Sequence, residues 1–417
     1  MISYSRHILG NGLTLLIHED ASTPLVTVNT LYKVGSRNEN PERTGFAHLF
    51  EHLMFGGTPA VPDFDREVSM MGGESNAFTN NDYTDYYITA PSDCLQSMLT
   101  LEADRMKGLD FNERPLSVQR QVVVEEYKQR YMGTPYADKW LLLRPLCFRH
   151  HPYRWCPIGA DIEHVRQATV ADEIAFFNQH YTPSNAIVSV AGDVCADEVL
   201  QVVQSLYGSI GSESQPRSVA DLPAEPEQQQ ANRQEVTRNV PSDALFIAYR
   251  MCSHTHPDFF VYDVISDILS NGKSSRMYNR LVKDFRLFSE IDAYITGDWD
   301  QGLFVVDGRL MPGVSMQQAE AAVYEELEQL KQQLVDDYEL LKVVNKYEST
   351  FAFSQYQVPD RALGLCVCEF MGHVDWVNNE PQLYRCVTPA DIRRVATQCF
   401  QPQRSNVLYY RAANANQ

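Results

Sequence analysis

Apolar and polar residues alternate along the N-terminal part of the chain first with a strand period and then with a helical period. A strand-like run at residues 13–18 follows a Gly-Asn-Gly turn, and VTVNTLYKVG at 26–35 forms a second such run. The next segment, GFAHLFEHLMF at 45–55, spaces its apolar residues three and four apart, which predicts an amphipathic helix. We therefore expect strands with helices packed on them.

The same order of elements returns in the second half of the chain. A strand-like run, ALFIAYRM at 244–251, precedes the helical segment DFFVYDVISDILSNG at 258–272. A weaker echo relates residues 184–194 to residues 405–412, and a long helical pattern covers residues 317–347. These features predict an α+β fold of two similar domains, each a mostly antiparallel sheet with helices packed on it.

A polar stretch separates the two halves. Residues 208–233 read GSIGSESQPRSVADLPAEPEQQQANR, which is rich in Ser, Gln, Glu and Pro and has no apolar period. We therefore expect an N-terminal domain at 1–210, a linker at 211–235 and a C-terminal domain at 236–417. A chain of 417 residues is long enough for two or three domains with their own cores.

Charge and cysteine usage exclude several classes of partner. The chain has 54 acidic and 35 basic residues, a net charge of −19, which disfavours nucleic acid or an anionic membrane surface as a partner. No run approaches the roughly 20 apolar residues of a spanning helix, and the N-terminus lacks the features of a signal peptide. The nine cysteines form no C-x-x-C pair, which is typical of reduced thiols. Together these features predict a cytoplasmic protein.

The predicted helix at 45–55 carries the chemistry. His48 and His52 are four residues apart, so that their imidazoles lie on one face, one turn apart, as two ligands of one zinc ion require. Glu51 lies beside them and can serve as general base toward water at the metal. This H-x-x-E-H pattern is the inverted zincin signature.

A catalytic zinc needs a third protein ligand and an open position. The helical segment SVQRQVVVEEYKQRY at 117–131 offers two neighbouring carboxylates, Glu125 and Glu126. Adjacent residues on a helix point about 100° apart, so only one of them can face the histidines. Spacing alone does not choose between the two.

These two segments together resemble the pitrilysin or insulinase family of zinc metallopeptidases, in its shorter, two-domain branch. The resemblance extends from near the N-terminus to the last strand, and it includes residues 33–58, 72–87, 151–159, 180–194 and 271–281. It implies two similar domains arranged as a clam shell around a chamber, with one Zn²⁺ per chain.

The resemblance also assigns roles to individual residues. The family's ligand glutamate is the second of its pair, which makes Glu126 the third ligand and leaves Glu125 facing solvent or supporting a ligand from outside the site. The family's edge strand binds the substrate backbone, and a peptide can indeed pair with an exposed strand through backbone hydrogen bonds. In this chain that strand contains Asn76, Ala77, Phe78 and Thr79.

Two departures from the family pattern are visible. A frequent glutamate is replaced by Gln119, which can still hydrogen-bond behind a metal ligand but lacks the negative charge; we expect activity to survive. An Arg and a Tyr of single-chain members, which contact the substrate, fall here on Val282 and Ser289. The nearby Arg276, Arg280 and Tyr294 are out of register.

The sequence therefore predicts a zinc endopeptidase subunit that cleaves short or unfolded peptides in an enclosed chamber. In the family's two-chain enzymes one subunit carries the zinc motif and a related subunit carries the Arg/Tyr pair. We expect this chain to be the zinc subunit of such a heterodimer, with a homodimer as the alternative. A non-catalytic scaffold subunit and a small-amide hydrolase on the same fold are the rival functions.

Overall fold

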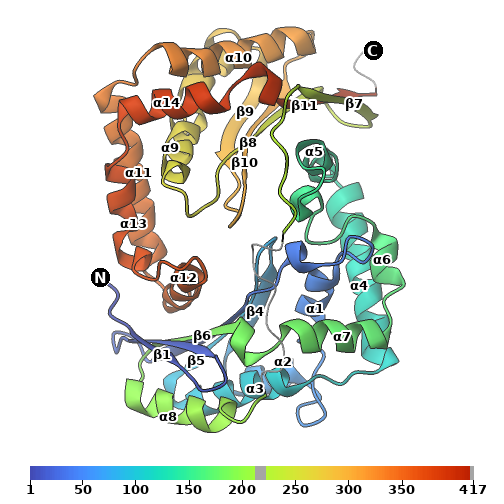
Figure 1. Ribbon diagram of the computed structural model, residues 1–417, viewed down its shortest axis with the longest axis vertical. Helices are drawn as coiled ribbons and strands as arrows, with labels where there is room; N and C mark the ends of the chain where they lie inside the picture. The colour runs from blue at the N-terminus through green and yellow to red at the C-terminus, as the bar shows by residue number, and fades with distance from the viewer. Residues whose placement is uncertain (212–221, 414–417) are drawn as a thin grey trace. The chain divides into compact units, whose positions relative to one another are not determined.

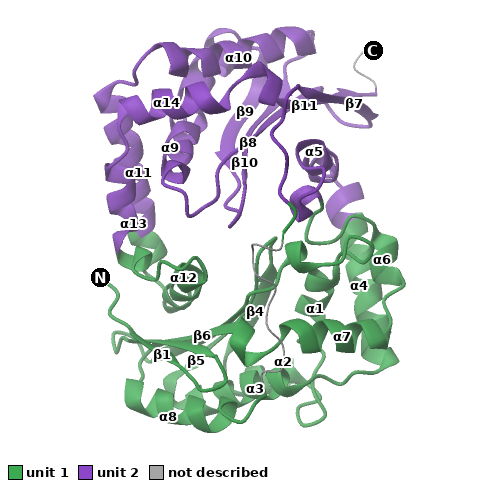
Figure 2. Cartoon of the chain, viewed as in Figure 1, with its two compact units in different colours: residues 1–128, 155–223, 352–378 green, residues 129–154, 224–351, 379–417 purple. Residues whose placement is uncertain are grey.

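The computed structural model describes residues 1–211 and 222–413. These residues form two compact units, shown in green and purple in Figure 2. The N-terminal unit comprises residues 1–128, 155–223 and 352–378, and the C-terminal unit comprises residues 129–154, 224–351 and 379–417.

Each predicted domain, 1–210 and 236–417, is one continuous stretch of the chain. Each observed unit is instead made of three separate stretches. Within the predicted linker at 211–235, residues 212–221 lie outside the described residues. Residues 232–235 at its C-terminal end already belong to a strand. The position of the boundary therefore stays a prediction.

The N-terminal unit is built on a six-stranded sheet (Figure 1). Its strands lie in the order β1 (Ser5–Ile8), β2 (Thr14–Glu19), β6 (Ala186–Gly192), β3 (Leu25–Tyr32), β5 (Thr84–Pro91) and β4 (Glu74–Thr79). Only the pair formed by β2 and β6 is parallel. β4 thus forms one edge of the sheet.

Helices cover both faces of this sheet. Thr30 of β3 donates a hydrogen bond to Glu102 of α3 (Leu95–Lys107) at 2.8 Å. The next residue, Leu31, packs instead against Leu365 of α12 (Val358–Phe370). Because successive strand residues point to opposite faces, α3 and α12 lie on opposite sides, and α8 (Ala196–Tyr207) packs beside α3.

The C-terminal unit contains a five-stranded sheet. The order is β7 (Asn232–Arg238), β11 (Asn406–Ala412), β8 (Ala244–Arg250), β10 (Leu303–Leu310) and β9 (Phe288–Ile295). Only the pair formed by β7 and β11 is parallel. Ala248 packs with α5 (Lys139–Cys147), whereas Tyr249 contacts Phe400 after α14 (Pro389–Cys399), so both faces are covered here too.

The two sheets share one topology. Numbered from β2 and from β7, the five strands of each lie in the order first, fifth, second, fourth, third. The similarities expected between the two halves fall on equivalent strands. Residues 26–35 and 244–251 contain β3 and β8, and residues 184–194 and 405–412 contain β6 and β11. The predicted α+β fold of two similar, mostly antiparallel domains is confirmed.

One expected helix is in fact two. Residues 317–347 divide into α10 (Met316–Gln332) and α11 (Asp337–Ser354), because Gln333 is extended and Asp336 accepts the N–H of Tyr338 at 2.8 Å, which starts a new helix. The other α-helices of the described residues are α1 (Phe46–Leu53), α2 (Phe64–Met70), α4 (Glu113–Met132), α6 (Ile162–Arg166), α7 (Val170–His180), α9 (Asp258–Ser270) and α13 (Trp376–Arg385).

Within the described ranges, no helix combines the length and the apolar character that crossing a bilayer requires. The cytoplasmic location stays a prediction.

Candidate metal centre

The centre is built on α1, an amphipathic helix of eight residues. Phe46, Leu49, Phe50 and Leu53 are buried and anchor one face of the helix to the N-terminal unit. His48 and His52 share a different stripe of the helix one turn apart, and their ring centroids are 4.9 Å apart. The apolar pattern that forms the helix therefore also sets the direction of both imidazoles.

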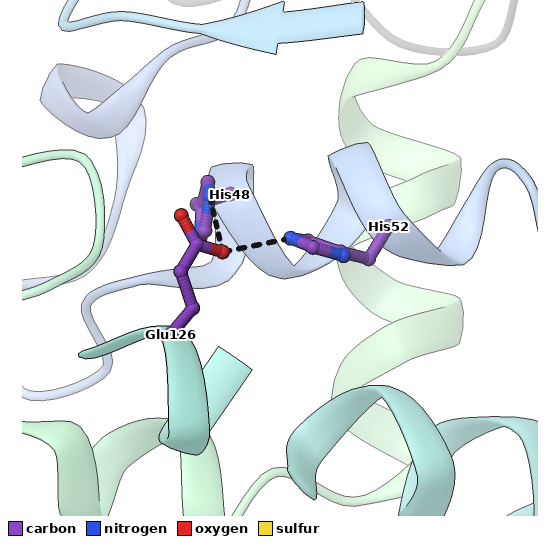
Figure 3. Close-up of side chains that lie close together, drawn as sticks. All are labelled: His48, His52 and Glu126. Atoms are coloured by element: carbon purple, nitrogen blue, oxygen red, sulfur yellow. Dashed lines mark ion pairs between the residues drawn. The ribbon is translucent and has the colours of Figure 1, made fainter. Parts of the chain in front are cut away.

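A third ligand comes from α4. The Oε2 atom of Glu126 lies 3.5 Å from Nε2 of His48 and 3.3 Å from Nε2 of His52 (Figure 3). All three ligand atoms lie within 4.8 Å of one another. The structure thus brings together the three residues that were expected to bind zinc.

The spacing of these atoms fits a zinc ion. Ligand atoms at about 2.0–2.1 Å from one tetrahedral zinc lie about 3.3 Å from each other, close to the two distances seen here. Two imidazoles and one carboxylate are also a known donor set of catalytic zinc sites. His48 is buried, whereas the side chains of His52 and Glu126 are 24% and 23% exposed, so that solvent reaches one side of the cluster.

Glu51 lies half-buried on α1 between the two histidines. In the core next to α1, the buried hydroxyls of Tyr86 and Tyr181 form a hydrogen bond of 3.0 Å, and Tyr86 also donates to the carbonyl of Phe50 at 3.3 Å. Burial is the main cause that raises the pKa of both phenols, and the negative charge of Glu51 adds to it. Both phenols therefore stay neutral, and their hydroxyls bond to each other and, for Tyr86, to the carbonyl of Phe50.

These two tyrosines were not expected from the sequence. Tyr86 follows the alternation of β5 and Tyr181 follows α7, and nothing in either local pattern relates them to the metal helix. Only the tertiary packing brings their hydroxyls within reach of the charge of Glu51.

The structure separates the two neighbouring glutamates of α4. Glu125 is 63% exposed and forms an ion pair with Lys128 at 2.6 Å, away from the histidines. Gln119 is half-buried seven residues before Glu126, and since seven residues are nearly two turns, it lies on the same face of α4. Of these three residues, only Glu126 is brought to the histidines.

The expected substrate strand is β4, at the edge of the sheet and packed against α1. Asn76 is exposed, and its Oδ1 accepts the N–H of Ala77 at 2.8 Å. Phe78 packs edge-on against Tyr83, and Thr79 bonds to the hydroxyl of Thr84 at 3.3 Å. As an edge strand beside α1, β4 is placed for strand addition.

The two residues that the family resemblance aligns with the Arg and Tyr of single-chain members lie in the C-terminal unit. Val282 is in the helical turn η6 (Tyr278–Asp284), and Ser289 of β9 donates to the carbonyl of Arg309 at 3.3 Å.

The three nearby candidates have structural contacts. Arg276 forms an ion pair with Glu339 at 2.6 Å, and Arg280 forms one with Glu326 at 2.8 Å. Tyr294 is partly buried against the core of the unit.

The fold and the centre together are those of the inverted zincins. The chain has two α+β units, and the first contains an H-x-x-E-H helix together with a carboxylate from a second helix. Comparison with known proteins agrees. The family model described as insulinase, peptidase family M16, matches residues 14–134, and the model described as the peptidase M16 inactive domain matches residues 167–347. The chain belongs to the insulinase family of peptidases.

Individual relatives support this assignment. The chain is 28% identical to the zinc protease PqqE of Helicobacter pylori, over 96% of this chain and 91% of that protein. The crystal structure of a protease from Helicobacter pylori superposes with a TM-score of 0.90 at 28% identity, covering 99% of this chain and 100% of that one. A probable mitochondrial-processing peptidase subunit beta of Arabidopsis thaliana is 27% identical over 72% of this chain and 58% of its own length.

Proposed function

We propose that this chain is the zinc-binding subunit of an endopeptidase that cleaves short or unfolded peptides in an enclosed chamber. The observation that carries the proposal is the cluster of His48, His52 and Glu126, whose ligand atoms lie within 4.8 Å of one another, with Glu51 on the same helix as both histidines. These residues would hold one Zn²⁺ per chain.

Zinc, when bound by these residues, supplies a Lewis acid that polarises a carbonyl group and acidifies water at its open position. Glu51 accepts a proton from the attacking water and delivers it to the leaving amine, as a general base and then a general acid. The same side chain thus takes up the proton and gives it to the product, and Glu51 is unprotonated again at the end of the reaction.

The peptide would bind along β4. A substrate in extended conformation can add to this edge strand through backbone hydrogen bonds, which give affinity without strict sequence selection. Asn76, Ala77, Phe78 and Thr79 would provide that strand. The packing of β4 against α1 supports this arrangement, because the peptide would then run beside the helix that holds the histidines.

We further propose that the complete enzyme needs a related chain. Val282 and Ser289 stand where single-chain members of the family carry Arg and Tyr, so this chain lacks those two substrate contacts. One relative is named as the beta subunit of a probable mitochondrial-processing peptidase, which supports a paired assembly. A heterodimer is the proposed form, and a homodimer is the alternative.

The Glu51→Gln variant tests the mechanism. The amide keeps the shape of the side chain but cannot accept the proton, so zinc content should stay at the wild-type level while peptide hydrolysis falls by about 10²- to 10⁴-fold. Zinc is measured by atomic absorption and hydrolysis with a quenched fluorescent peptide, with the related chain present. Full activity of the zinc-loaded variant would contradict the role of Glu51.

Two neighbouring residues of α4 provide a test of the ligand assignment and its matched control. Glu126→Gln should lose zinc and activity together, because it removes a metal ligand. Glu125→Gln makes the same chemical change one residue away, at an exposed ion pair with Lys128, and should retain both. Loss of zinc in Glu125→Gln but not in Glu126→Gln would reverse the ligand assignment.

A non-catalytic scaffold subunit is the second candidate function. It is favoured by the match of residues 167–347 to a family model that is described as an inactive domain. The two functions differ in one measurement: a scaffold would bind zinc and yet hydrolyse no peptide, alone or with the related chain.

A further inference from the structure

The N-cap residue of α1, the helix that carries both histidines, has no side chain that could cap the helix. This residue is Gly45, which has a φ of 89° and no side-chain oxygen to accept the N–H groups of the first turn. A residue of the preceding loop accepts them instead. The carboxylate of Glu39 accepts the N–H of Gly45 at 2.9 Å and the N–H of Ala47 at 2.8 Å.

Glu39 is held firmly in this position. It is only 3% exposed, and its carboxylate also accepts the indole N–H of Trp155 at 3.1 Å. Burial raises the pKa of Glu39 to about 8, whereas the N–H donors around it favour the charged form. A carboxylate at a helix N-terminus is stabilised by the helix dipole, so the group matches its surroundings.

The loop that carries Glu39 is anchored at its other end by the turn that follows β4. The N–H of Arg37 donates to the carbonyl of Asn81 at 2.9 Å, and its guanidinium forms a buried ion pair with Asp82 at 3.1 Å. A Cβ at Gly35 would lie 2.4 Å from the backbone nitrogen of Asp82, so the loop lies directly on the turn. Residues 35–45 therefore connect the end of β4 to the start of α1 by fixed contacts at both ends.

We propose that Glu39 is a positioning residue of the metal centre, which fixes the first turn of α1 and so holds His48 where it can bind the metal. His48 is the third residue of an eight-residue helix, and it follows directly the residue whose N–H Glu39 accepts. Loosening of the first turn would displace His48 before His52, which lies one turn further along. The inference rests on the proposed function, since it takes these histidines as metal ligands.

The test is the zinc affinity of the Glu39→Gln variant, measured by competition with a chromogenic chelator. The amide retains the shape of the side chain but turns one acceptor into an N–H₂ group that faces N–H donors. We expect zinc to bind about tenfold more weakly, within the range typical of residues that orient metal ligands from outside. With zinc in excess, kcat should fall while KM stays nearly constant.

Asp63→Asn is the matched control. Asp63 caps α2 in the same unit by accepting the N–H of Arg66 at 3.0 Å, and α2 carries none of the site residues. The same carboxylate-to-amide change there should leave zinc affinity within about twofold, because Asn is an equally good N-cap residue. If Glu39→Gln does not fold, Glu39→Asp takes its place, since it keeps the carboxyl group but shortens the reach to α1, and it too should weaken zinc binding.

A purely structural role for Glu39 predicts a different result. In that case the folded variant melts at a lower temperature but binds zinc with wild-type affinity, and this outcome would overturn the proposal. A failure of the proposed peptidase function is distinguishable, because wild-type protein would then bind zinc without hydrolysing peptide. The difference in zinc affinity between Glu39→Gln and wild type tests the positioning role in either case.

Discussion

Gly45 allows α1 to begin at the place where its histidines are needed. Its φ of 89° is unfavourable for residues with a Cβ, and a Cβ there would lie 2.7 Å from both the carbonyl oxygen of Ile158 and Cγ2 of Val165. Gly45→Ala should therefore lower the free energy of unfolding by about 2–4 kcal/mol, from the backbone penalty and the crowding together. Urea unfolding of the metal-free protein, followed by circular dichroism, measures this loss.

Gly72→Ala separates the two contributions. Gly72 also has a positive φ, 67°, but a Cβ there would meet nothing within 4 Å. This variant should lose only the backbone part, about 1 kcal/mol. Equal losses at Gly45 and Gly72 would show that the contact with Ile158 and Val165 has no energetic weight.

At the scale of residues, the spacing of His48, Glu51 and His52 suffices to predict their common helix face, because the helical period fixes it. The choice of Glu126 over Glu125 required the family resemblance, since both are compatible with a helix of the same period. Glu39 and Tyr86 could not be related to the site from the sequence. Their contacts arise from a loop closure and from strand pairing, which no local pattern encodes.

At the scale of elements, the strands were predictable because buried β-branched runs and turns mark them, and the echo between the halves indicated a repeated unit. The break between α10 and α11 was missed, since the apolar period continues across residues 333–336 and hides it. The strand order depends on long-range pairing, such as that of β2 with β6. Local sequence carries no information on such pairs.

The helices α9, α11 and α13 of the C-terminal unit share a group of carboxyls and phenols. Tyr384 donates to Asp263 at 2.6 Å and stacks on Tyr347, with ring centroids 3.5 Å apart. Burial raises the pKa of Asp263 to about 6, and it raises the pKa of Glu380, which is hydrogen-bonded to Tyr347, to about 7. These carboxyls therefore bind protons more tightly in the folded than in the unfolded chain.

The pH dependence of stability follows from this difference. The contribution of Asp263 is fully present well below its unfolded-state pKa of about 4, where the carboxyl is protonated in both states, and it is lost as the pH rises from there through 6. Asp263→Asn cannot ionise, so its stability relative to wild type should increase by about 2 kcal/mol between pH 4 and pH 7. Thermal unfolding at several pH values measures this, with pH 4 as the internal reference. Parallel stability profiles of the two proteins would contradict the shifted pKa.

At the scale of the whole molecule, the chain does not divide at one point. α5 belongs to the C-terminal unit although it lies in the first half of the sequence, and α12 belongs to the N-terminal unit although it lies in the second. Leu365 and Cys366 of α12 pack on Leu16, Leu31 and Ile187 of the N-terminal sheet. The apolar stripe of a helix shows that one face is buried but not which sheet buries it.

The proposed need for a related chain makes the last prediction. The family resemblance places the Arg and Tyr of single-chain members at Val282 and Ser289, and on that basis we expect the zinc-loaded chain alone to hydrolyse a quenched peptide slowly. Addition of a related chain that carries the Arg/Tyr pair should raise kcat/KM by roughly 10²-fold or more, the usual effect of one donor to a developing oxyanion.

Two controls assign the gain in rate to the two chains. A related chain with Arg and Tyr replaced by Val and Ser should give no increase, and Glu51→Gln of this chain should abolish the activity of the mixture. The rate should also saturate at one related chain per chain, since the pair would complete one site. High activity of this chain by itself, unchanged on mixing, would show that its own residues stabilise the oxyanion, and the missing pair would then have no bearing on catalysis.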